Sequence, residues 1–561
     1  MADQPSAEEV VFLPLGGIGE IGMNCYLYGL GPEDRRQWLM VDLGITFPEG
    51  EFDPGVDVIL PDVRFIAEER KALVGIVLTH AHEDHFGAVI ELWPRLRAPV
   101  YATPFTAALL RAKLAEFGSR EEIEIHEVQL NTRFNVGPFD LEMISVAHSI
   151  PEPNALALRT AQGLMLHTGD WKIDDTPYVG QPIDRKRLKV IGDEGVVAMI
   201  SDSTNALREG RSPSESEVAE TLKKIIKGAK RRVAVTIFAS NVSRIKAVAD
   251  AARASGRQIV VAGRAMHRMI SVAIATGYLP PDFRYQDQQH FTYIAPDEVV
   301  VLCTGSQGES RAALARIADD QHPDIRLDRG DLVIFSSRTI PGNERVVGRI
   351  QNKLVEMGCE LVTDNEALVH VTGHPRREEM RELYGWIRPR IAIPMHGEAR
   401  HIAEHAKLAR EAGVAEVLRL RNGDVVRLAP GKAEIIDEAP VGRLFRDGEL
   451  LIESESSAVR ERRALSFAGI AVVALSISQK GEVGPAEILL DGIPRENEAG
   501  RPMLSIVQDA VENTIRSIPP KGRREVETVR EAVRRGVRSI IETHWGKRPI
   551  TKVLVTRAPR V

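Results

Sequence analysis

Short apolar runs separated by turns make up most of the first 205 residues. The clearest runs are VVFLPLGG, QWLMVDLG, GIVLTH, PVYATP, LEMISVAHS and LMLHTGD, and a helical pattern, PFTAALLRAKLAEFG, occupies 104–118. Apolar runs of this length, bounded by Gly, Pro and polar residues, are typical of buried strands. Strands interleaved with helices predict layered α/β structure.

A second alternation begins near residue 215. Helix-like SEVAETLKKIIKGAK is followed by strand-like RRVAVTIFAS, helix-like SRIKAVADAARASG, strand-like QIVVAG and helix-like AMHRMISVAIATG. Strands that are joined through helices usually pair in parallel. This stretch therefore predicts an inserted α/β domain with its own parallel sheet at 206–360.

The rest of the chain completes the domain map. After residue 366 the sequence returns to strand-rich text, so 361–430 is expected to complete the domain that 1–205 begins. A linker rich in turns and charges is expected at 431–455, followed by a small α+β C-terminal domain at 456–561. In that domain a helix is predicted at 524–542 from the helical spacing of Val526, Val529, Val533, Val537 and Ile540.

Composition narrows the class of protein. The chain has 561 residues, of which 43% are hydrophobic and 27% charged, which is typical of a soluble protein of several domains. No apolar run approaches the roughly 20 residues of a membrane-spanning helix, and the acidic start MADQPSAEEV does not resemble a secretory signal. Cys25, Cys303 and Cys359 lie far apart, which favours reduced thiols packed in cores. We therefore expect a cytoplasmic protein that does not associate with membranes.

Charge is distributed unevenly along the chain. The formal net charge of −6 argues weakly against a nucleic-acid binder, but residues 516–561 carry 13 Lys and Arg against 4 Asp and Glu. The basic tail helix could contact phosphates, or it could be a solvated face with an oligomer contact on its apolar side. The sequence favours the second alternative without excluding the first.

The most informative motif is HAHEDH at 80–85, directly after the strand-like run VGIVLT. It places His80, His82, Asp84 and His85, four side chains that can bind a metal, within six positions. Neutral imidazole and carboxylate suit zinc or manganese, and a solvated polar loop would rarely collect so many. The motif predicts the beginning of a metal site with ligands for two ions.

Four more polar residues end strand-like runs. His148, Asp170 and His396 follow LEMISVA, LMLHTG and IAIPM and can supply further ligands. Alone, His148 or His396 would more often be an ordinary core or surface histidine, but the presence of HAHEDH favours ligation. Asp42, which closes WLMVD, is either a hydrogen-bonding support for the ligand loops or a turn residue.

HAHEDH, together with His148, Asp170 and Asp42, resembles the motif series of the metallo-β-lactamase fold. This resemblance implies an αββα sandwich with the active site along one edge. It also implies two divalent ions, zinc first and manganese or magnesium as alternatives, which activate water and neutralise charge during attack on phosphorus. By motif match, one ion would be held by His80, His82 and His148 and the other by Asp84, His85 and His396, with Asp170 bridging them.

Three further features resemble the β-CASP branch of this fold, whose members cut nucleic acids. They are Asp202 in MISDSTN, His374 in VHVTGHP and His396 in PMHGE. The resemblance implies that His374 protonates the leaving oxygen and that Asp202 orients it, so these two residues and Asp84 form the expected catalytic set. The alternative for Asp202 is a helix cap within its S-D-S-T run.

Nearly the whole chain, from about residue 10, is similar to the bacterial ribonuclease J family. The matching passages include PLGGIGEIGMNCYLY, GITFPEG, LTHAHEDHFGA, HTGDWKID, SDSTNA, CTGSQGE, IPGNE and PMHGE. The resemblance implies a 5′-to-3′ exoribonuclease that prefers single-stranded RNA with a 5′ monophosphate and also has endonuclease activity, in RNA maturation and decay. It further implies homodimers or homotetramers built through the C-terminal domain.

One motif departs from the family pattern. Many members read S-G-H followed by a small residue and serine, where this chain reads Thr372, Gly373, His374, Pro375 and Arg376. Thr372 keeps a hydroxyl and Gly373 keeps an exposed backbone, but an arginine replaces the small polar residue. The guanidinium of Arg376 could bind a terminal phosphate in bidentate fashion, or it could point to solvent.

Other candidates for contact with RNA are weaker. Phe47 in GITFPEG could stack a base or simply anchor its loop. Ser306 in CTGSQGES and Ser337 in IFSSRTIPGN follow strand-like runs, in loops that could offer hydrogen-bond donors to phosphate. We expect the remaining histidines, including His401 and His405, at the surface.

Two other functions compete with the nuclease. A hydrolase of this fold could act on a small thioester or lactone, but a small substrate needs neither the large insert nor His374. A catalytically silent scaffold in a degradation complex is the other alternative. Silent members usually lose ligands, and every expected ligand is present in this chain. The sequence therefore favours a two-metal ribonuclease.

Overall fold

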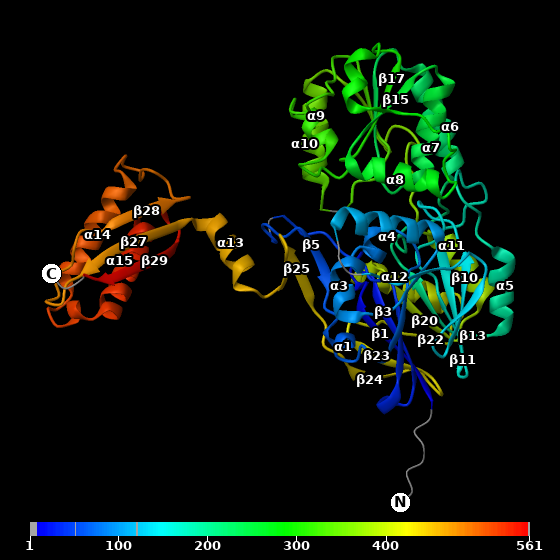
Figure 1. Ribbon diagram of the computed structural model, residues 1–561, viewed down its shortest axis with the longest axis horizontal. Helices are drawn as coiled ribbons and strands as arrows, with labels where there is room; N and C mark the ends of the chain where they lie inside the picture. The colour runs from blue at the N-terminus through cyan, green and yellow to red at the C-terminus, as the bar shows by residue number, and fades with distance from the viewer. Residues whose placement is uncertain (1–7, 51, 119–121, 341, 559–561) are drawn as a thin grey trace, which may run out of the picture. The chain divides into compact units, whose positions relative to one another are not determined.

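The computed structural model describes residues 8–50, 52–118, 122–340 and 342–558. The chain divides into two compact units, of which the first comprises 1–46 and 59–444 and the second comprises 47–58 and 445–561 (Figure 1). The first unit contains the sandwich and the inserted domain.

Two mixed sheets form the centre of the first unit. One sheet has the order β24 (Glu434–Glu438), β23 (Asp424–Ala429), β1 (Glu9–Gly16), β3 (Cys25–Gly31), β4 (Gln37–Val41), β6 (Leu73–Val77), β7 (Val100–Ala102) and β8 (Ile125–Glu127). The other has the order β22 (Glu416–Val417), β20 (Ile391–Met395), β13 (Val196–Asp202), β12 (Gly163–His167), β11 (Asn154–Thr160), β10 (Phe139–Ser145) and β9 (Arg133–Val136).

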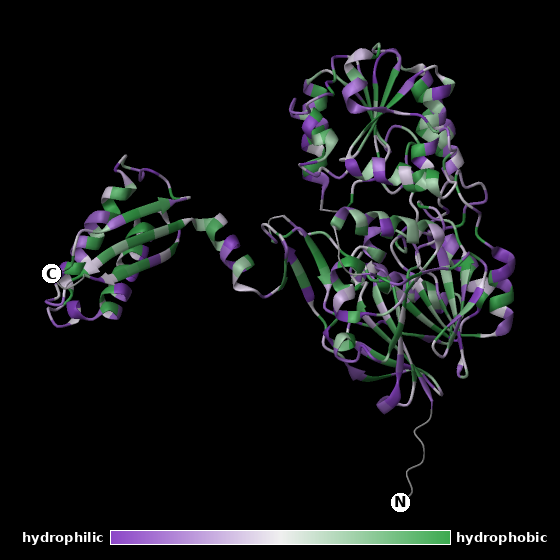
Figure 2. Cartoon of the chain, viewed as in Figure 1, coloured by the Kyte–Doolittle hydropathy of each residue, from purple (hydrophilic) through white to green (hydrophobic). Residues whose placement is uncertain are grey.

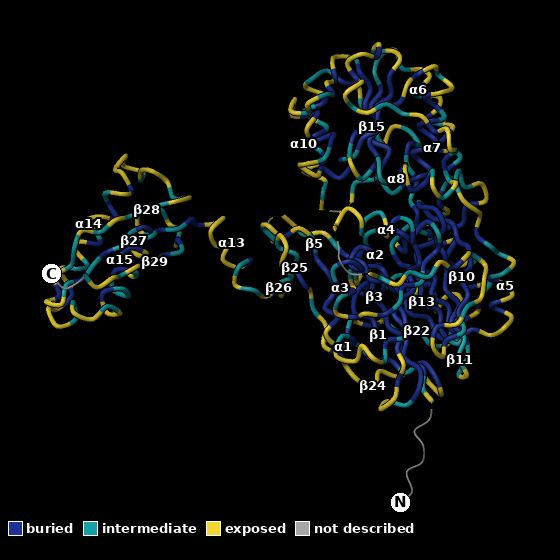
Figure 3. The backbone as a smooth tube through the Cα atoms, in the orientation of Figure 1, coloured by how far each residue is buried: buried dark blue, intermediate teal, exposed yellow. Residues whose placement is uncertain are grey.

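The apolar strands of both sheets enclose one core. Phe12 and Leu39 from the first sheet lie in the same fully buried cluster as Met143 and Ile200 from the second. Figure 2 shows these strands as mainly hydrophobic, and Figure 3 shows them as buried. Because the strands are apolar over most of their length, they are stable only with both faces covered.

Helices cover the outer faces of the two sheets. The outer side of the second sheet packs in a separate hydrophobic cluster against α5 (Arg185–Glu194), α11 (Arg377–Ile387) and α12 (Ala399–Glu411). On the first sheet, Phe65 of α1 (Arg64–Glu68) packs edge-on against Trp38 of β4, and α3 (Val89–Leu96) lies beside α1. The predicted αββα sandwich is therefore confirmed.

The inserted domain is a parallel sheet between helices. Its order is β16 (Gln286–Asp287), β15 (Gln258–Ala262), β17 (Val299–Cys303), β14 (Val233–Thr236), β18 (Leu332–Phe335) and β19 (Glu360–Val362), and all its pairings are parallel. The last strand straddles residue 360, the expected end of the insert. The helices are α6 (Glu215–Gly228), α7 (Val242–Ala254), α8 (Arg264–Ala275), α9 (Ala313–Ala318) and α10 (Glu344–Glu356).

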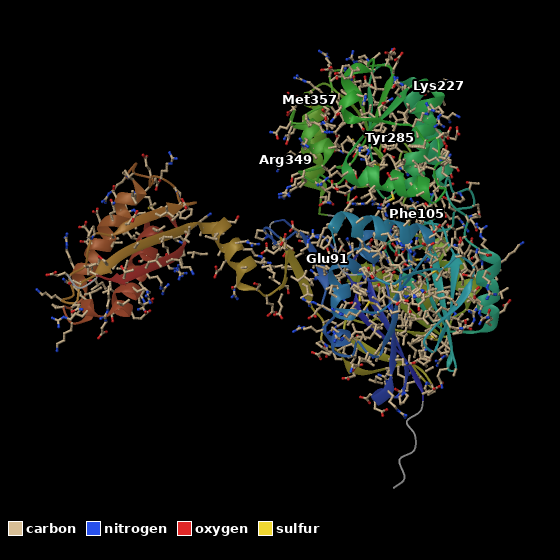
Figure 4. All side chains as sticks on the ribbon, in the orientation of Figure 1. Glu91, Phe105, Lys227, Tyr285, Arg349 and Met357 are labelled. Carbon is tan, nitrogen blue, oxygen red and sulfur yellow. The ribbon has the colours of Figure 1, made fainter. Side chains whose placement is uncertain are left out.

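The insert contacts the sandwich through α8 and α4 (Pro104–Phe117). Phe105, labelled in Figure 4, begins α4 and packs edge-on against Tyr278 of the insert. The buried carboxylate of Glu152 accepts hydrogen bonds from the Phe105 amide and the Tyr278 hydroxyl. These contacts join the insert to the sandwich at helix α4.

The second unit has a three-stranded sheet with two helices packed on it. The strand order is β28 (Glu487–Asp491), β27 (Ile470–Ile477) and β29 (Ile550–Arg557), and the helices are α14 (Met503–Ser517) and α15 (Val526–Trp545). The helix predicted at 524–542 is therefore present, but Ile541 rather than Ile540 is fully buried with Val529, Val533 and Val537. The small helix α13 (Ser457–Ala468) precedes this sheet.

Two other expectations concern the chain as a whole. Cys25, Cys303 and Cys359 are buried free thiols, as their spacing predicted. None of the helices in the described part of the chain is long and apolar enough to cross a membrane.

Candidate metal centre

The candidate ligands lie where strands of the two sheets end. Strand β13 pairs in parallel with β12 and with β20, so their carboxyl ends share one edge of the second sheet. Asp170 follows β12, Asp202 ends β13, and His396 directly follows β20. HAHEDH follows β6 of the first sheet, and its second half forms the short helix α2 (Glu83–Phe86) with His82 as its N-cap.

The first ligand set is His80, His82, His148 and Asp170, whose donor atoms lie within 4.8 Å of one another. Nδ1 of His82 is 3.1 Å from Nε2 of His80 and 3.0 Å from Nε2 of His148. Oδ2 of Asp170 is 3.8 Å from Nε2 of His80 and 3.6 Å from Nε2 of His148. Three imidazoles and one carboxylate thus face a common point.

The second set is Asp84, His85, Asp170 and His396, again within 4.8 Å. Oδ2 of Asp170 lies 3.2 Å from Nε2 of His85 and 3.6 Å from Nε2 of His396. Oδ2 of Asp84 is 3.7 Å from Nε2 of His85 and 3.6 Å from Nε2 of His396. The same Asp170 oxygen therefore faces both sets.

Hydrogen bonds at the outer nitrogens orient the histidines of the first set. Nδ1 of His148 donates to the backbone carbonyl of Gly373 at 2.6 Å. The Thr79 hydroxyl donates to Asp42, so its oxygen accepts from Nδ1 of His80 at 3.0 Å. With the outer Nδ1 protonated in His80 and His148, the inner Nε2 of each presents a lone pair, as a metal ligand must. His82 faces the same point with its Nδ1.

The histidines of the second set are oriented in the same way. Nδ1 of His85 donates to Oδ2 of Asp42 at 2.7 Å, and Nδ1 of His396 donates to Oδ1 of Asn24 at 2.9 Å. Asp42 also accepts from the Thr79 amide at 2.8 Å. Asp42 therefore lies behind the ligands rather than among them, and it supports His85 directly and His80 through Thr79.

Two residues of the centre have a strained backbone. Asp42 has φ of +62° and His396 has φ of +49°, conformations that cost a residue other than glycine on the order of 1 kcal/mol. Such conformations persist only where surrounding contacts fix them, and both residues are fully or almost fully buried in the hydrogen-bond network. The strain is therefore part of the construction of the site.

Protonation agrees with the donor geometry of the first set. Burial, with neighbouring histidines, lowers the pKa of His80 and His148 well below the ordinary value, and burial lowers that of His82 to about 4. In His85, burial is outweighed by the carboxylates of Asp170, Asp84 and Asp42, which raise its pKa. A cation at the second set would displace that proton, so its binding releases a proton.

The residues fit divalent ions. Lone pairs of three rings about 3 Å apart repel one another unless a cation lies between them, and nitrogen with carboxylate oxygen is a donor set that suits zinc. Oδ1 of Asp170 and Nε2 of His396 are buried without a hydrogen-bond partner among the described residues. A bound ion would give these atoms a partner.

His374 and Asp202 form a pair beside the ligands. Nδ1 of His374 donates to Oδ2 of Asp202 at 2.7 Å and lies 3.7 Å from Oδ2 of Asp170. Burial would lower the pKa of His374, but the charges of Asp202 and Asp170 and the hydrogen bond raise it to about 9. The side-chain amide of Asn205 holds the loop that carries His374, because it donates to the Thr372 hydroxyl and to the His374 carbonyl.

The loops that carry the candidate RNA contacts lie side by side. Gln307, next to the buried Ser306, donates to the carbonyl of Arg338, which follows the buried Ser337. Ser336 donates to the carbonyl of Val369, and buried Arg244 donates to both residues. The loops at 304–309, 336–340 and 369–376 are thus joined to one another, and the last of them carries His374.

Phe47 does not belong to these loops. It is 64% exposed and lies in the second compact unit. Gly373 and Thr372, by contrast, lie at the centre. The carbonyl of Gly373 accepts from His148, and the hydroxyl of Thr372 accepts from the amide of His374.

Three of the histidines that were expected at the surface are buried. His167 is fully buried, with its Nδ1 3.0 Å from the Tyr28 hydroxyl. His405 is fully buried between the Ser203 hydroxyl and the Tyr384 hydroxyl, and His401 is 7% exposed. Their spacing of four on α12, with apolar Ile402 and Ala406 beside them, is a helical signal that places them on one face. The expectation was wrong because a polar residue type was given more weight than its position in the pattern.

Some supporting residues have no clear signal in the sequence. Asn24 lies in GMNCYLY, an apolar run, and Thr79 directly precedes HAHEDH. Glu379 is fully buried and accepts hydrogen bonds from the amides of Ile173, Ser212 and Arg376, so it ties three loops together. Each role depends on partners that are distant in the sequence.

Comparisons with known proteins agree with this architecture. The chain matches the families described as "Beta-lactamase superfamily domain" over 52–184, "Ribonuclease J, beta-CASP domain" over 230–354, "Zn-dependent metallo-hydrolase RNA specificity domain" over 360–418, and "Ribonuclease J C-terminal domain" over 457–558. A solved structure described as a protein of unknown function from Enterococcus faecalis covers 75% of the chain, and the whole of that structure aligns, with a TM-score of 0.51 at 16% identity. That likeness concerns the fold alone.

Curated relatives match over nearly the full length. The chain is 50% identical to Ribonuclease J of Sinorhizobium meliloti over 556 residues, which are 99% of this chain and 98% of the relative. It is 38% identical to Ribonuclease J of Mycolicibacterium smegmatis, with 96% and 95% covered, and 34% identical to Ribonuclease J 1 of Streptococcus pyogenes, with 97% and 96% covered. The chain therefore belongs to the ribonuclease J family and is a metal-dependent enzyme that hydrolyses RNA.

Proposed function

We propose that this enzyme is a two-metal ribonuclease that degrades single-stranded RNA in the 5′-to-3′ direction from a 5′-monophosphate end and also cuts internally. Its role would be in RNA maturation and decay. The observation that carries the proposal is the pair of ligand sets that share Oδ2 of Asp170, with His374 and Asp202 beside them.

The ligand sets assign the residues that would hold the ions. The first ion would be held by His80, His82 and His148 and the second by Asp84, His85 and His396, with Asp170 between them. Zinc is the proposed metal because five of these seven side chains are imidazoles, and manganese or magnesium are the alternatives. The chemistry that bound divalent ions supply is activation of water and neutralisation of charge on the scissile phosphate.

The protein supplies the proton for the leaving oxygen. Nδ1 of His374 is engaged by Asp202, so the proton available to substrate is the one on Nε2. A pKa of about 9 keeps this ring protonated at neutral pH, and transfer of the Nε2 proton completes cleavage of the phosphorus–oxygen bond. Asp202 holds the ring in place and stabilises its charged form.

Recognition of the 5′ end is proposed for the joined loops at 304–309, 336–340 and 369–376. Nε of Arg376 and Nδ1 of His370 are buried without a hydrogen-bond partner among the described residues. Burial and the nearby guanidinium groups of Arg244 and Arg338 lower the pKa of His370 well below its ordinary value, which marks a positive region. A terminal phosphate would give the Arg376 nitrogen an acceptor, and guanidinium matches phosphate in bidentate fashion.

Self-association is proposed for the second unit. On its sheet, the side chains of β27 alternate between buried and half-buried positions, so one face of the sheet packs on the helices and the other does not. On that outer face, Leu489 pairs across from Val472 and Leu554 pairs across from Ala474, and the two leucines are 54% and 59% exposed. An exposed apolar sheet face supports a homodimer or homotetramer that is built through this domain.

The test uses single-stranded RNA with a fluorescent 3′ end and a 5′ monophosphate, triphosphate or hydroxyl, in the presence of Mn²⁺, Mg²⁺ or Zn²⁺. The proposal predicts rapid release of mononucleotides from the monophosphate substrate and no release by Asp170→Ala. Internal cuts alone, without release of mononucleotides from the 5′-monophosphate end, would overturn the exonuclease part of the proposal. Absence of cleavage with every metal would overturn the catalytic assignment.

A further inference from the structure

Asn24 is fully buried just before β3 and touches both the HAHEDH loop and the end of β20. We infer that Asn24 is a positioning residue that holds His396 in the orientation and tautomer needed for the second metal. This inference deepens the proposed function and rests on it, because His396 is a proposed ligand.

The hydrogen bonds of the Asn24 side chain fix its orientation. Nδ2 is 3.0 Å from the backbone oxygen of Asp84, which can only accept, so Nδ2 is the donor there. Nδ2 also lies 3.1 Å from Nε2 of His85, so Asn24 contacts two histidines of the second set. Oδ1 therefore faces the other way, where the Tyr26 hydroxyl donates to it at 2.7 Å and Nδ1 of His396 donates at 2.9 Å. Both acceptor positions of Oδ1 are filled.

This arrangement determines which nitrogen of His396 carries the proton. If Nδ1 were unprotonated, its lone pair would face the lone pairs of the Asn24 oxygen in a buried site, which is unfavourable. The proton is therefore on Nδ1, and Nε2 presents its lone pair 3.6 Å from the carboxylates of both Asp84 and Asp170. Nε2 has no hydrogen-bond partner among the described residues, as expected of an atom reserved for an ion.

The backbone around Asn24 fixes this geometry from three sides. The Asn24 amide donates to the Asp84 carbonyl, and the Asn24 carbonyl accepts from the amide of Gly44. The amide of His396 donates to the carbonyl of Gly17. At Gly17, φ is +84°, and an added Cβ would lie 2.2 Å from the Tyr26 hydroxyl and 2.6 Å from Oδ1 of Asn24, so only glycine leaves this network intact.

Asn24 has the same relation to His396 that Asp42 has to His85. Each accepts the outer Nδ1–H of a histidine whose Nε2 faces the second ligand set. Within the described part of the chain, no hydrogen bond joins Asn24 to a histidine of the first set, in which Thr79 and Gly373 are the outer partners. Loss of Asn24 should therefore weaken the second metal and spare the first.

Metal binding to the full-length protein tests this inference without reference to activity. Apoprotein would be titrated with Zn²⁺ by calorimetry in the presence of a competing chelator. Asn24→Leu, which has similar volume but no acceptor, should weaken the second Zn²⁺ about 10–100-fold and change the first less than about threefold. Asn24→Ala should do the same and replaces the leucine variant if that variant does not fold.

The matched control is Tyr26→Phe, which removes the other donor to the same oxygen and leaves His396 bonded. It should change neither affinity by more than about threefold. In a double-mutant cycle, Asn24→Ala should weaken the second Zn²⁺ less when it is added to His396→Ala than when it is made alone, because Asn24 acts mainly through His396 and only the contact of its Nδ2 with His85 remains.

The outcomes separate this inference from the proposed function. Wild-type protein that binds a single Zn²⁺ would contradict the two-metal proposal itself. Wild-type protein that binds two ions, with Asn24→Ala also binding two at unchanged affinity or weakening both equally, would overturn only the role of Asn24. Additive effects in the cycle would also overturn it, because they would mean that Asn24 acts independently of His396.

Discussion

The metal centre and the three loops at 304–309, 336–340 and 369–376 both contain buried polar atoms without a hydrogen-bond partner among the described residues, but they differ in how far the surrounding side chains are oriented by other hydrogen bonds. In the metal centre, Asp42, Thr79, Gly373 and Asn24 occupy the outer nitrogens of four histidines. In the loops, Arg376 has a buried guanidinium nitrogen with no hydrogen-bond partner among the described residues. The candidate metal ligands are thus oriented in advance, whereas the loops keep a buried donor that the proposed function assigns to the substrate.

This difference has a physical reason. Ligands must be held closely to bind an ion, because small errors in position cost a large part of the affinity and of the rate. A site for the end of a flexible RNA can instead gain binding energy by satisfying a buried charge when the phosphate arrives. Changes in the metal centre should therefore abolish cleavage, and changes in the loops should alter the choice of RNA end.

The largest effect is expected at Asp170, which faces both ligand sets. Asp170→Ala should lower the rate of RNA cleavage more than about a thousandfold, because the loss of one supporting hydrogen bond near a metal already costs about 10–100-fold. The rates at which the wild type and Asp170→Ala cleave 5′-monophosphate RNA measure this loss. Asp175→Ala, at a side chain that is 65% exposed, is the control, and a residual rate of one tenth or more for Asp170→Ala would contradict the shared-ligand arrangement.

His374→Ala should have the next largest effect. Loss of a general acid typically costs about 10²–10⁴-fold in rate, and metal content should stay unchanged because His374 is not in the proposed ligand sets. Single-turnover rates and bound metal, measured on the same sample, test both parts. The control is His126→Ala on β8, and loss of metal from His374→Ala would assign this histidine to metal binding instead.

Asp202→Asn should lower the rate of cleavage less than His374→Ala does and should shift the pH–rate profile. A misplaced His374 is expected to cost about 10–100-fold. Burial lowers the pKa of His374, but Asp202, together with Asp170 and Asp84, raises it to about 9, so loss of the Asp202 charge lowers that pKa. The acid form is the active one, so activity should fall at a lower pH on the alkaline side than in the wild type. A pH–rate profile with an unchanged alkaline limb would remove Asp202 from this role.

Arg376→Ala should have the smallest effect and should be specific for the RNA end. Preference for a 5′ monophosphate over a hydroxyl should fall about tenfold, the value of one hydrogen bond to a charged group, while internal cleavage keeps its rate. Competition between the two RNAs measures this ratio. Arg381→Ala, at an arginine paired with Glu209, is the control, and an unchanged ratio would mean that Arg376 does not contact the phosphate.

The sequence predicted the layers and the residues at the strand ends because both depend on local patterns. Apolar runs form the strands, and a side chain that directly follows a buried strand is held at the edge of the sheet. His148, Asp170 and His396 carry this signal, and the structure brings them to HAHEDH. The parallel sheet of the insert followed from its alternation of strands and helices.

The supporting residues could not be predicted in the same way. Asn24 and His396 are separated by 372 positions, and nothing in an apolar run such as GMNCYLY indicates which distant ring its amide will meet. Phe47 carried a stacking hypothesis from its loop motif, but the sequence does not show to which compact unit that loop belongs. The burial of His405 follows from its helical spacing to apolar residues on α12, although histidine as a residue type favoured a surface position.

The central claim is that two ions share Asp170 in the centre formed by HAHEDH, His148 and His396. Crystals of the zinc-loaded protein, with diffraction measured on both sides of the zinc absorption edge, test it most directly. The account predicts two anomalous peaks per chain, one beside His80, His82 and His148 and one beside Asp84, His85 and His396, with Asp170 contacting both. A single peak, or a second peak that does not contact Asp170, would contradict it.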